Sequence, residues 1–181
     1  MLISVDGIDS VGKTTIANRI AKSLGGNALK CVPVALKTAE QYFMAQDSID
    51  SKFLFYLSAY LSTVLDVTRS HDRPIIFDRY IYSNLAYHRA FGAKLDIRHI
   101  FEIAPVPDYA VYITCPKERW RHLLSAKPEL DWYEAGLLAD PGKVERIESE
   151  FSAMGLRQII NDNLETAICQ IQADLGRLQE R

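Results

Sequence analysis

The sequence predicts an α/β fold with a mainly parallel central sheet that helices cover on both faces. Short apolar runs rich in β-branched residues alternate along the chain with stretches of helical spacing, and a glycine-rich loop, 7–12, directly follows the first run. With 181 residues, of which 48% are hydrophobic, the chain can build one domain with a sizeable core. Ligands of this architecture bind where the strands end.

Each expected element rests on a local pattern. The first strand, 2–5, is apolar, and the helix after the loop, 14–24, has helically spaced apolar residues and a stop at Gly25-Gly26. Helical spacing also predicts a long helix over 51–70. Further strands are expected at 31–37, where Pro33 favours an edge, and at 74–77, 109–114 and 157–160. Later helices are expected over 117–124, 140–151 and 164–178.

Composition excludes several classes of protein. The 21 basic and 23 acidic residues leave a net charge of −2, so there is no global attraction to nucleic acid or to an anionic membrane. Cys31, Cys115 and Cys169 are far apart and form no C-x-x-C, which favours free thiols over disulfides or a zinc site. The chain shows neither a leader nor a stretch long enough to span a membrane. We therefore expect a cytoplasmic protein without a membrane partner.

The stretch "GIDSVGKT" fits the phosphate-binding pattern G-x-x-x-x-G-K-[ST]. Glycines at both ends let the backbone N–H groups turn inward towards phosphate oxygens, aided by the N-terminus of the next helix. Lys13 is expected to reach the β- and γ-phosphates, and the Thr14 hydroxyl to ligate Mg²⁺. The residues expected around ATP are Gly7, Asp9, Ser10, Val11, Gly12, Lys13, Thr14 and Thr15.

The rest of the chain narrows the chemistry of this phosphate site. A regulatory GTPase needs the guanine-reading N-K-x-D, which the sequence lacks, and 181 residues hardly accommodate a motor ATPase. A small kinase using ATP and Mg²⁺ is the economical interpretation, because one compact domain can position a donor against a small acceptor.

Four stretches make the sequence resemble the thymidylate kinase family of nucleoside monophosphate kinases. They are "VDGIDSVGKTT", "DRYIYSNLAYHRAFG" at 78–92 and "ELDWYE" at 129–134, while "RIESEF" and the closing strand and helix match more loosely. The resemblance implies a three-layer P-loop kinase fold, a mainly parallel sheet and a helical lid at about 116–145. It also implies a single domain over 1–181 and a possible homodimer.

The resemblance implies roles for individual residues. Asp9 would hold a sugar hydroxyl of the acceptor, Asp78 would face Mg²⁺ through water, and Arg79 would contact phosphate. Tyr87 and His88 would lie near the acceptor base.

Two groups of side chains have competing structural interpretations. Arg119 and Arg121 head the lid and could neutralise charge on the transferred phosphoryl group, or form a solvated helix face. Phe43, Phe53 or Tyr56 could stack on the base, although most such aromatics are expected in the core.

Departures from the family pattern concentrate where the acceptor's phosphate would bind. The family's R-E-P-G is replaced by "LKTAEQ", in which Lys37 offers only a point charge, and Tyr60 lies near the place of a second arginine. His88 replaces a base-recognising Gln, and Trp132 replaces a lid Arg. Losing such arginines removes strong charge-assisted hydrogen bonds to a phosphate.

Three hypotheses therefore remain open. The acceptor is a thymidine-like pyrimidine nucleotide, or it is a neutral hydroxyl on a nucleoside or on a 5-hydroxymethyl pyrimidine base in DNA. A hydroxyl needs a base, for which Asp78 is the choice among Asp78, Asp6, Asp9 and Glu40. DNA would need a local groove lined by Lys37, Lys52, Arg89 and the lid arginines. The third hypothesis is a nucleotide-binding regulatory protein without transfer.

Overall fold

The structure is a computed structural model that describes residues 1–30, 32–70, 72–95 and 98–180. Five strands form a sheet in the order β2-β3-β1-β4-β5, and every pairing in it is parallel. The strands are β1 (Leu2–Gly7), β2 (Asn27–Lys30), β3 (Ile75–Asp78), β4 (Tyr109–Thr114) and β5 (Arg157–Ile160). The expected mainly parallel α/β sheet is confirmed, and four of its five strands overlap the predicted segments.

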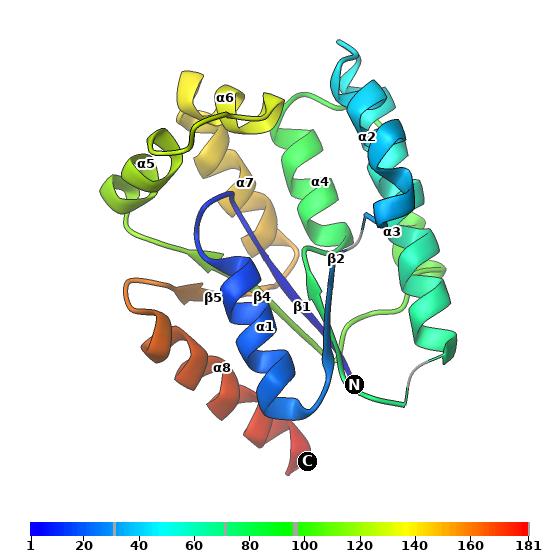
Figure 1. Cartoon of the computed structure of the whole chain (residues 1–181), viewed down its shortest axis with the longest axis vertical. Coiled ribbons are helices and arrows are strands. Elements are labelled where there is room, and N and C mark those ends of the chain that lie inside the picture. Colours follow the sequence, from blue (N-terminus) through cyan, green and yellow to red (C-terminus); the bar gives the residue numbers. More distant parts are fainter. Residues whose placement is uncertain (31, 71, 96–97, 181) are drawn as a thin grey trace.

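Helices cover both faces of this sheet (Figure 1). They are α1 (Lys13–Leu24), α2 (Lys37–Met44), α3 (Ile49–Ser70), α4 (Ile81–Ala90), α5 (Lys117–Ser125), α6 (Trp132–Ala139), α7 (Gly142–Ala153) and α8 (Leu164–Gln179). One layer is formed by α1 and α8, and the other by α3, α4 and α7. In Figure 1, α5 and α6 lie above the end of the sheet where β1 runs into the glycine loop. In the described part of the chain, no helix is long and apolar enough to cross a membrane.

One predicted strand, at 31–37, is wrong. Cys31 lies outside the described residues, Val34–Leu36 form a 3₁₀ turn, and α2 begins at Lys37. The turn closes where the Leu36 N–H donates to the Pro33 carbonyl oxygen over 3.0 Å, so the apolar run turns instead of extending. Strand β2 comes earlier and begins at Asn27, two residues after the left-handed Gly25 that ends α1.

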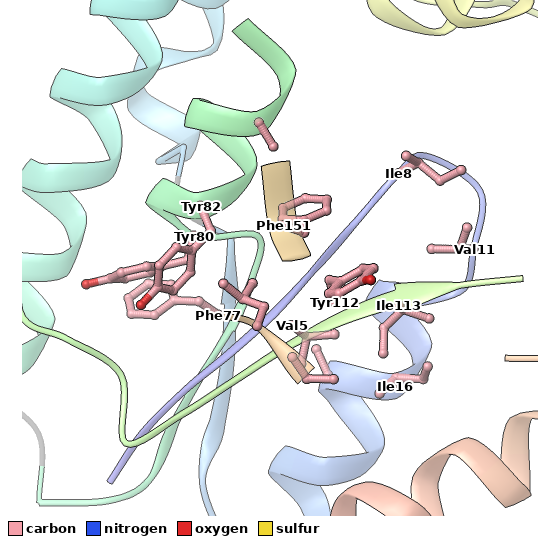
Figure 2. Close-up of a cluster of buried hydrophobic side chains, with 14 of the residues drawn as sticks. Val5, Ile8, Val11, Ile16, Phe77, Tyr80, Tyr82, Tyr112, Ile113 and Phe151 are labelled. Atoms are coloured by element: carbon pink, nitrogen blue, oxygen red, sulfur yellow. The ribbon is translucent and has the colours of Figure 1, made fainter. Parts of the chain in front are cut away.

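The buried core joins both layers to the sheet (Figure 2). Ile16 of α1 packs on one face near Val5 and Ile113. On the other face the ring of Phe151 from α7 stacks on Tyr112 of β4, with centroids 5.3 Å apart. This packing fixes the strand ends that carry the glycine loop and the segment after β3.

Asp6, near the end of β1, positions the segment that follows β3. Its Oδ1 accepts hydrogen bonds from the backbone N–H groups of Tyr80 (2.9 Å) and Ser83 (3.0 Å) and from the Ser83 hydroxyl (2.6 Å). These groups lie at the start of α4, so Asp6 caps this helix from a neighbouring strand. Burial raises the pKa of Asp6. Asp6 was a candidate base, but the structure gives it this capping role, outside the cavity described below.

We predict that Phe151→Ala lowers the free energy of unfolding by about 3–5 kcal/mol, because it removes a fully buried ring and leaves a cavity. The matched control is Tyr42→Ala, which truncates an exposed aromatic side chain and should cost less than about 1 kcal/mol. Urea denaturation of both variants checks this, and similar losses in the two would contradict the packing described.

Candidate active site

The loop between β1 and α1 forms a cradle of backbone groups. Gly7 and Gly12 have φ angles of 133° and 92°, a region that favours glycine. A Cβ on Gly7 would lie 2.3 Å from the Ile113 carbonyl oxygen, and a Cβ on Gly12 would lie 2.6 Å from Nδ2 of Asn161. Gly7 is therefore required by close approach to backbone as well as by its conformation, and Gly12 chiefly by its conformation.

Two side chains from the C-terminal half hold this loop in place. The Asn161 amide, after β5, donates to the Val11 carbonyl oxygen over 2.8 Å. The indole N–H of Trp120, on α5, donates to the Asp9 carbonyl oxygen over 3.0 Å. The hydroxyl of Ser10 is buried and lacks a partner within the described residues, so it can donate to a ligand oxygen in the cradle.

Lys13 and Thr14 begin α1 beneath the loop. The Lys13 ammonium is buried and donates to the Ile8 carbonyl oxygen over 2.5 Å, and burial lowers its pKa to about 8. The Thr14 hydroxyl donates to Oδ2 of Asp78 over 2.6 Å. A hydroxyl and a carboxylate held this close are oxygen ligands of the kind Mg²⁺ takes beside phosphates, so the pair fits that ion.

Asp9, Arg79 and Tyr87 form a partly buried cluster beside the cradle. Arg79 forms an ion pair with Asp9 and donates to the Gly7 carbonyl oxygen over 3.0 Å, while the Tyr87 hydroxyl donates to Asp9 over 2.7 Å. Burial works to raise the pKa of Asp9, but Arg79 and Lys13 lower it to about 2. Arg79 has a φ of 75°, unusual for a residue other than glycine, so the backbone is strained where this side chain turns into the site.

The cradle and this cluster open into one cavity of about 660 Å³. Its walls come from the glycine loop, β2, α2, α3, α4 and the lid. The lining residues are Asp9, Ser10, Gly12, Lys13, Thr14, Lys30, Val32, Lys37, Glu40, Tyr56, Tyr60, Asp78, Arg79, Ser83, Asn84, Tyr87, His88, Leu123, Lys127, Asp131, Tyr133 and Glu134. Every acceptor-site residue expected from the sequence lines this cavity, namely Asp9, Lys37, Tyr60, Tyr87 and His88.

His88 is held as a neutral imidazole in this wall. Its Nδ1 lies 2.7 Å from the Asn84 carbonyl oxygen, which can only accept, so Nδ1 carries the proton. Its Nε2 then accepts from the Tyr133 hydroxyl over 2.8 Å. Burial lowers the pKa of His88 to about 4. Phe53 stacks beneath the imidazole with centroids 4.9 Å apart and is core, as expected, whereas Tyr56 reaches the cavity.

The place where family arginines were expected contains a carboxylate held by two neighbours. Glu40, on α2, accepts from the Lys37 ammonium over 2.5 Å and from the Tyr56 hydroxyl over 3.0 Å. Among the described residues that line the cavity, Arg79 is the sole arginine. The sequence had indicated the missing arginines, but not that Glu40 would be bound by both Lys37 and Tyr56.

The lid brings different cations to the cavity from those expected. Arg119 donates to the backbone carbonyl oxygens of Asn161 (2.9 Å) and Asp162 (2.5 Å), and Arg121 is exposed. Neither lines the cavity, whereas Lys127 does. Asp131 and Glu134, which also line it, form a capping box at the start of α6. The D-x-x-E spacing before a helix is the sequence signal that could have located this pair.

Other expected residues lie elsewhere. Gly7, Val11 and Thr15 shape or flank the loop without lining the cavity. Lys52 is buried and donates to the Gln46 carbonyl oxygen, and Arg89 pairs with Glu150 over 2.8 Å. Lys52 and Arg89 therefore do not contribute to the basic groove that binding of DNA would require.

A fully parallel sheet, a glycine cradle between β1 and α1, and a Thr14–Asp78 pair beneath it define a P-loop phosphotransferase. A sequence model described as thymidylate kinase matches residues 5–131. The chain belongs to the thymidylate kinase family.

Individual relatives agree with this assignment. A probable thymidylate kinase of Archaeoglobus fulgidus is 31% identical over 155 residues, which cover 73% of this chain and 76% of the relative. A thymidylate kinase of African swine fever virus is 25% identical over 190 residues, covering 98% of this chain and 72% of the viral one.

Solved structures share the fold at lower identity. Thymidylate kinase from Candida albicans superposes with a TM-score of 0.76 at 18% identity, covering 98% of this chain and 92% of that one. Deoxyadenosine kinase from M. mycoides superposes with a TM-score of 0.71 at 17% identity, covering 98% and 100%. The fold is thus shared by kinases named for a nucleotide and for a nucleoside.

The neutral His88 predicts a dependence of stability on pH. Its pKa is about 4 in the folded protein and 6.5 ordinarily, so the unfolded chain binds the extra proton first. Stability from this group is complete above pH 6.5 and falls between pH 6.5 and 4, by about 3 kcal/mol in total. Urea denaturation at several pH values should show a flatter dependence for His88→Gln than for the wild type. Parallel curves would contradict the burial of a neutral imidazole.

Proposed function

We propose that the protein transfers the γ-phosphoryl group of ATP, with Mg²⁺, to a thymidine-like pyrimidine nucleotide. The observation that carries this proposal is that the phosphate cradle and the Asp9–Arg79–Tyr87 cluster open into the same cavity. Donor and acceptor can therefore meet in line without leaving the site. Family membership supports the nucleotide acceptor. A cytoplasmic location, a homodimer and a single domain over 1–181 remain predictions from the sequence.

On the donor side, the loop N–H groups and Ser10 would bind the phosphates, and Lys13 would move from the Ile8 carbonyl oxygen to the β- and γ-phosphates. Thr14 and Asp78 would hold Mg²⁺. When bound, this ion neutralises charge on the β- and γ-phosphate oxygens. Lys13 keeps a positive charge against that group because its pKa of about 8 lies above neutral pH.

On the acceptor side, the fixed Asp9 carboxylate would accept a hydrogen bond from a sugar hydroxyl, with Tyr87 beside it. Asn84 lines the cavity, and its amide oxygen is buried and has no hydrogen-bond partner in the described part of the chain. A pyrimidine N–H can supply the missing donor. Arg79 would contact the phosphoryl group between the two ligands.

One observation favours a second candidate, a neutral hydroxyl acceptor on a nucleoside. Glu40 presents a carboxylate to the cavity, next to Lys37 and Tyr56, where an acceptor phosphate would be repelled by it. A hydroxyl would instead lose its proton to a carboxylate as it attacks phosphorus. Because Asp78 would hold Mg²⁺ together with Thr14, Glu40 is the candidate for this base.

A substrate panel tests the acceptor. With MgATP, we expect turnover of dTMP, and little turnover of thymidine, deoxyadenosine or an oligonucleotide containing 5-hydroxymethyl uracil. Lys13→Ala should lower kcat by at least about 10²-fold because it removes the phosphate-binding ammonium. Lys22→Ala, an exposed lysine of the same helix, is the control that should keep wild-type activity. Turnover of thymidine without dTMP turnover would exclude the nucleotide proposal.

Glu40→Gln separates the two candidates. If the acceptor is a hydroxyl that Glu40 deprotonates, the variant should lose about 10²-fold in kcat with nucleosides. If the acceptor is a nucleotide, removing the charge should leave kcat with dTMP within a few-fold of the wild type. Glu165→Gln, an exposed carboxylate paired with Arg19, is the matched control for the charge change.

A further inference from the structure

The peptide group between Asp9 and Ser10 is held from outside the glycine loop. Its carbonyl oxygen accepts the indole N–H of Trp120 over 3.0 Å, and the next residue, Ser10, has a φ of 65°. A residue other than glycine is strained at such a φ and keeps it only where neighbouring groups fix the backbone. The contact with Trp120 lies on the peptide group directly before the strained residue, so it can maintain this conformation.

A second contact of the same kind occurs two residues later, but without strain. The Asn161 amide donates to the Val11 carbonyl oxygen over 2.8 Å, and the following residue, Gly12, has a φ of 92°. Glycine adopts this region at little cost. The backbone of the loop therefore depends on an outside contact at Ser10 more than it does at Gly12.

The Asp9–Ser10 peptide also sets the direction of a hydrogen-bond donor. The peptide is trans, so its C=O and N–H groups point to opposite sides. Because Trp120 binds the carbonyl oxygen, the Ser10 N–H is turned away from the indole. Ser10 lines the cavity, and its hydroxyl oxygen is buried without a partner among the described residues. Ser10 can therefore offer one backbone and one side-chain donor to the same anion.

Helix α5 is a firm support for the indole because its first turn is bound to the backbone after β5. Arg119 donates to the carbonyl oxygens of Asn161 (2.9 Å) and Asp162 (2.5 Å). Trp120, the next residue, is 3% exposed and packs in the hydrophobic core. Both the helix and the indole ring are thus fixed before a nucleotide binds.

We propose that Trp120 is a positioning residue for the phosphate donor. It keeps the Asp9–Ser10 peptide in the conformation in which the Ser10 N–H and hydroxyl bind a phosphate oxygen of the nucleotide. The role rests on the ATP-dependent transfer proposed above, but not on the identity of the acceptor.

The acceptor side of Asp9 does not need this support. Arg79 and Tyr87 hold the Asp9 carboxylate through its side chain, independently of the backbone carbonyl. Loss of the indole N–H should therefore weaken binding of the donor and leave binding of the acceptor unchanged.

Calorimetry with Trp120→Phe tests the donor role, because phenylalanine keeps a buried ring and removes the N–H. We expect AMP-PNP and ADP each to bind about 10-fold more weakly than to the wild type. The control is Trp132→Phe, which changes the other lid tryptophan, 39% exposed and outside the cavity, and should keep both affinities. Wild-type affinities in Trp120→Phe would overturn the proposal.

A second variant separates positioning from packing. Ser10→Gly relieves the strain at this φ, so the loop should hold its conformation with less help from the indole. In the Ser10→Gly background, Trp120→Phe should change the AMP-PNP affinity by no more than about threefold. A loss of about 10-fold in both backgrounds would assign Trp120 to packing alone and overturn the proposal.

Steady-state kinetics with the acceptor that the wild type uses give a further readout. Trp120→Phe should raise the KM for ATP by about 10-fold and leave the KM for the acceptor within about twofold of the wild type. Equal rises in both KM values would indicate general disruption of the site and contradict a role confined to the donor. Absent dTMP turnover would instead count against the proposed nucleotide acceptor, because the calorimetry uses no acceptor.

Discussion

The partly buried ion pair between Arg79 and Asp9 connects the two strand ends on which the site is built. Asp9 belongs to the loop after β1, and Arg79 follows β3, the strand paired with β1. Arg79 adopts a left-handed backbone to reach this position, and it also binds the Gly7 carbonyl oxygen. A single guanidinium therefore joins the cradle, the Asp9 carboxylate and α4, where it donates to the Tyr87 hydroxyl over 3.3 Å.

Much of the fold could be predicted because the local patterns and the tertiary structure agree. The parallel sheet, the loop "GIDSVGKT" and the helices over 14–24 and 51–70 carry their own signals in periodicity and glycine placement. Strand β2 could not be found in this way. Its four residues, "NALK", are partly exposed at an edge of the sheet and show no alternation of apolar and polar residues. The neighbouring run around Pro33 is more apolar, so the sequence predicts the strand there instead.

In the candidate site, too, some residues could be predicted from local motifs and others could not. Residues of the cradle and of the DRY segment at 78–80 could be predicted, because phosphate binding requires the residue types and spacing that their motifs contain. The lid side of the cavity could not be predicted, because Tyr133 and Lys127 reach the cavity only through the packing of α6 and of the turn after α5. The sequence shows that the lid contains arginines. It does not show which groups their long side chains contact in the folded protein.

Trp120 and Trp132, the two tryptophans of the chain, lie on different helices of the lid, α5 and α6. Trp120 donates its indole N–H to the Asp9 carbonyl oxygen in the cradle, and Trp132 covers the Lys52 ammonium, 3.8 Å from its ring. Indole emission responds to both kinds of contact. Each single-tryptophan variant is therefore a built-in optical probe, one for events at the donor loop and one for events at the junction of α6 with α3.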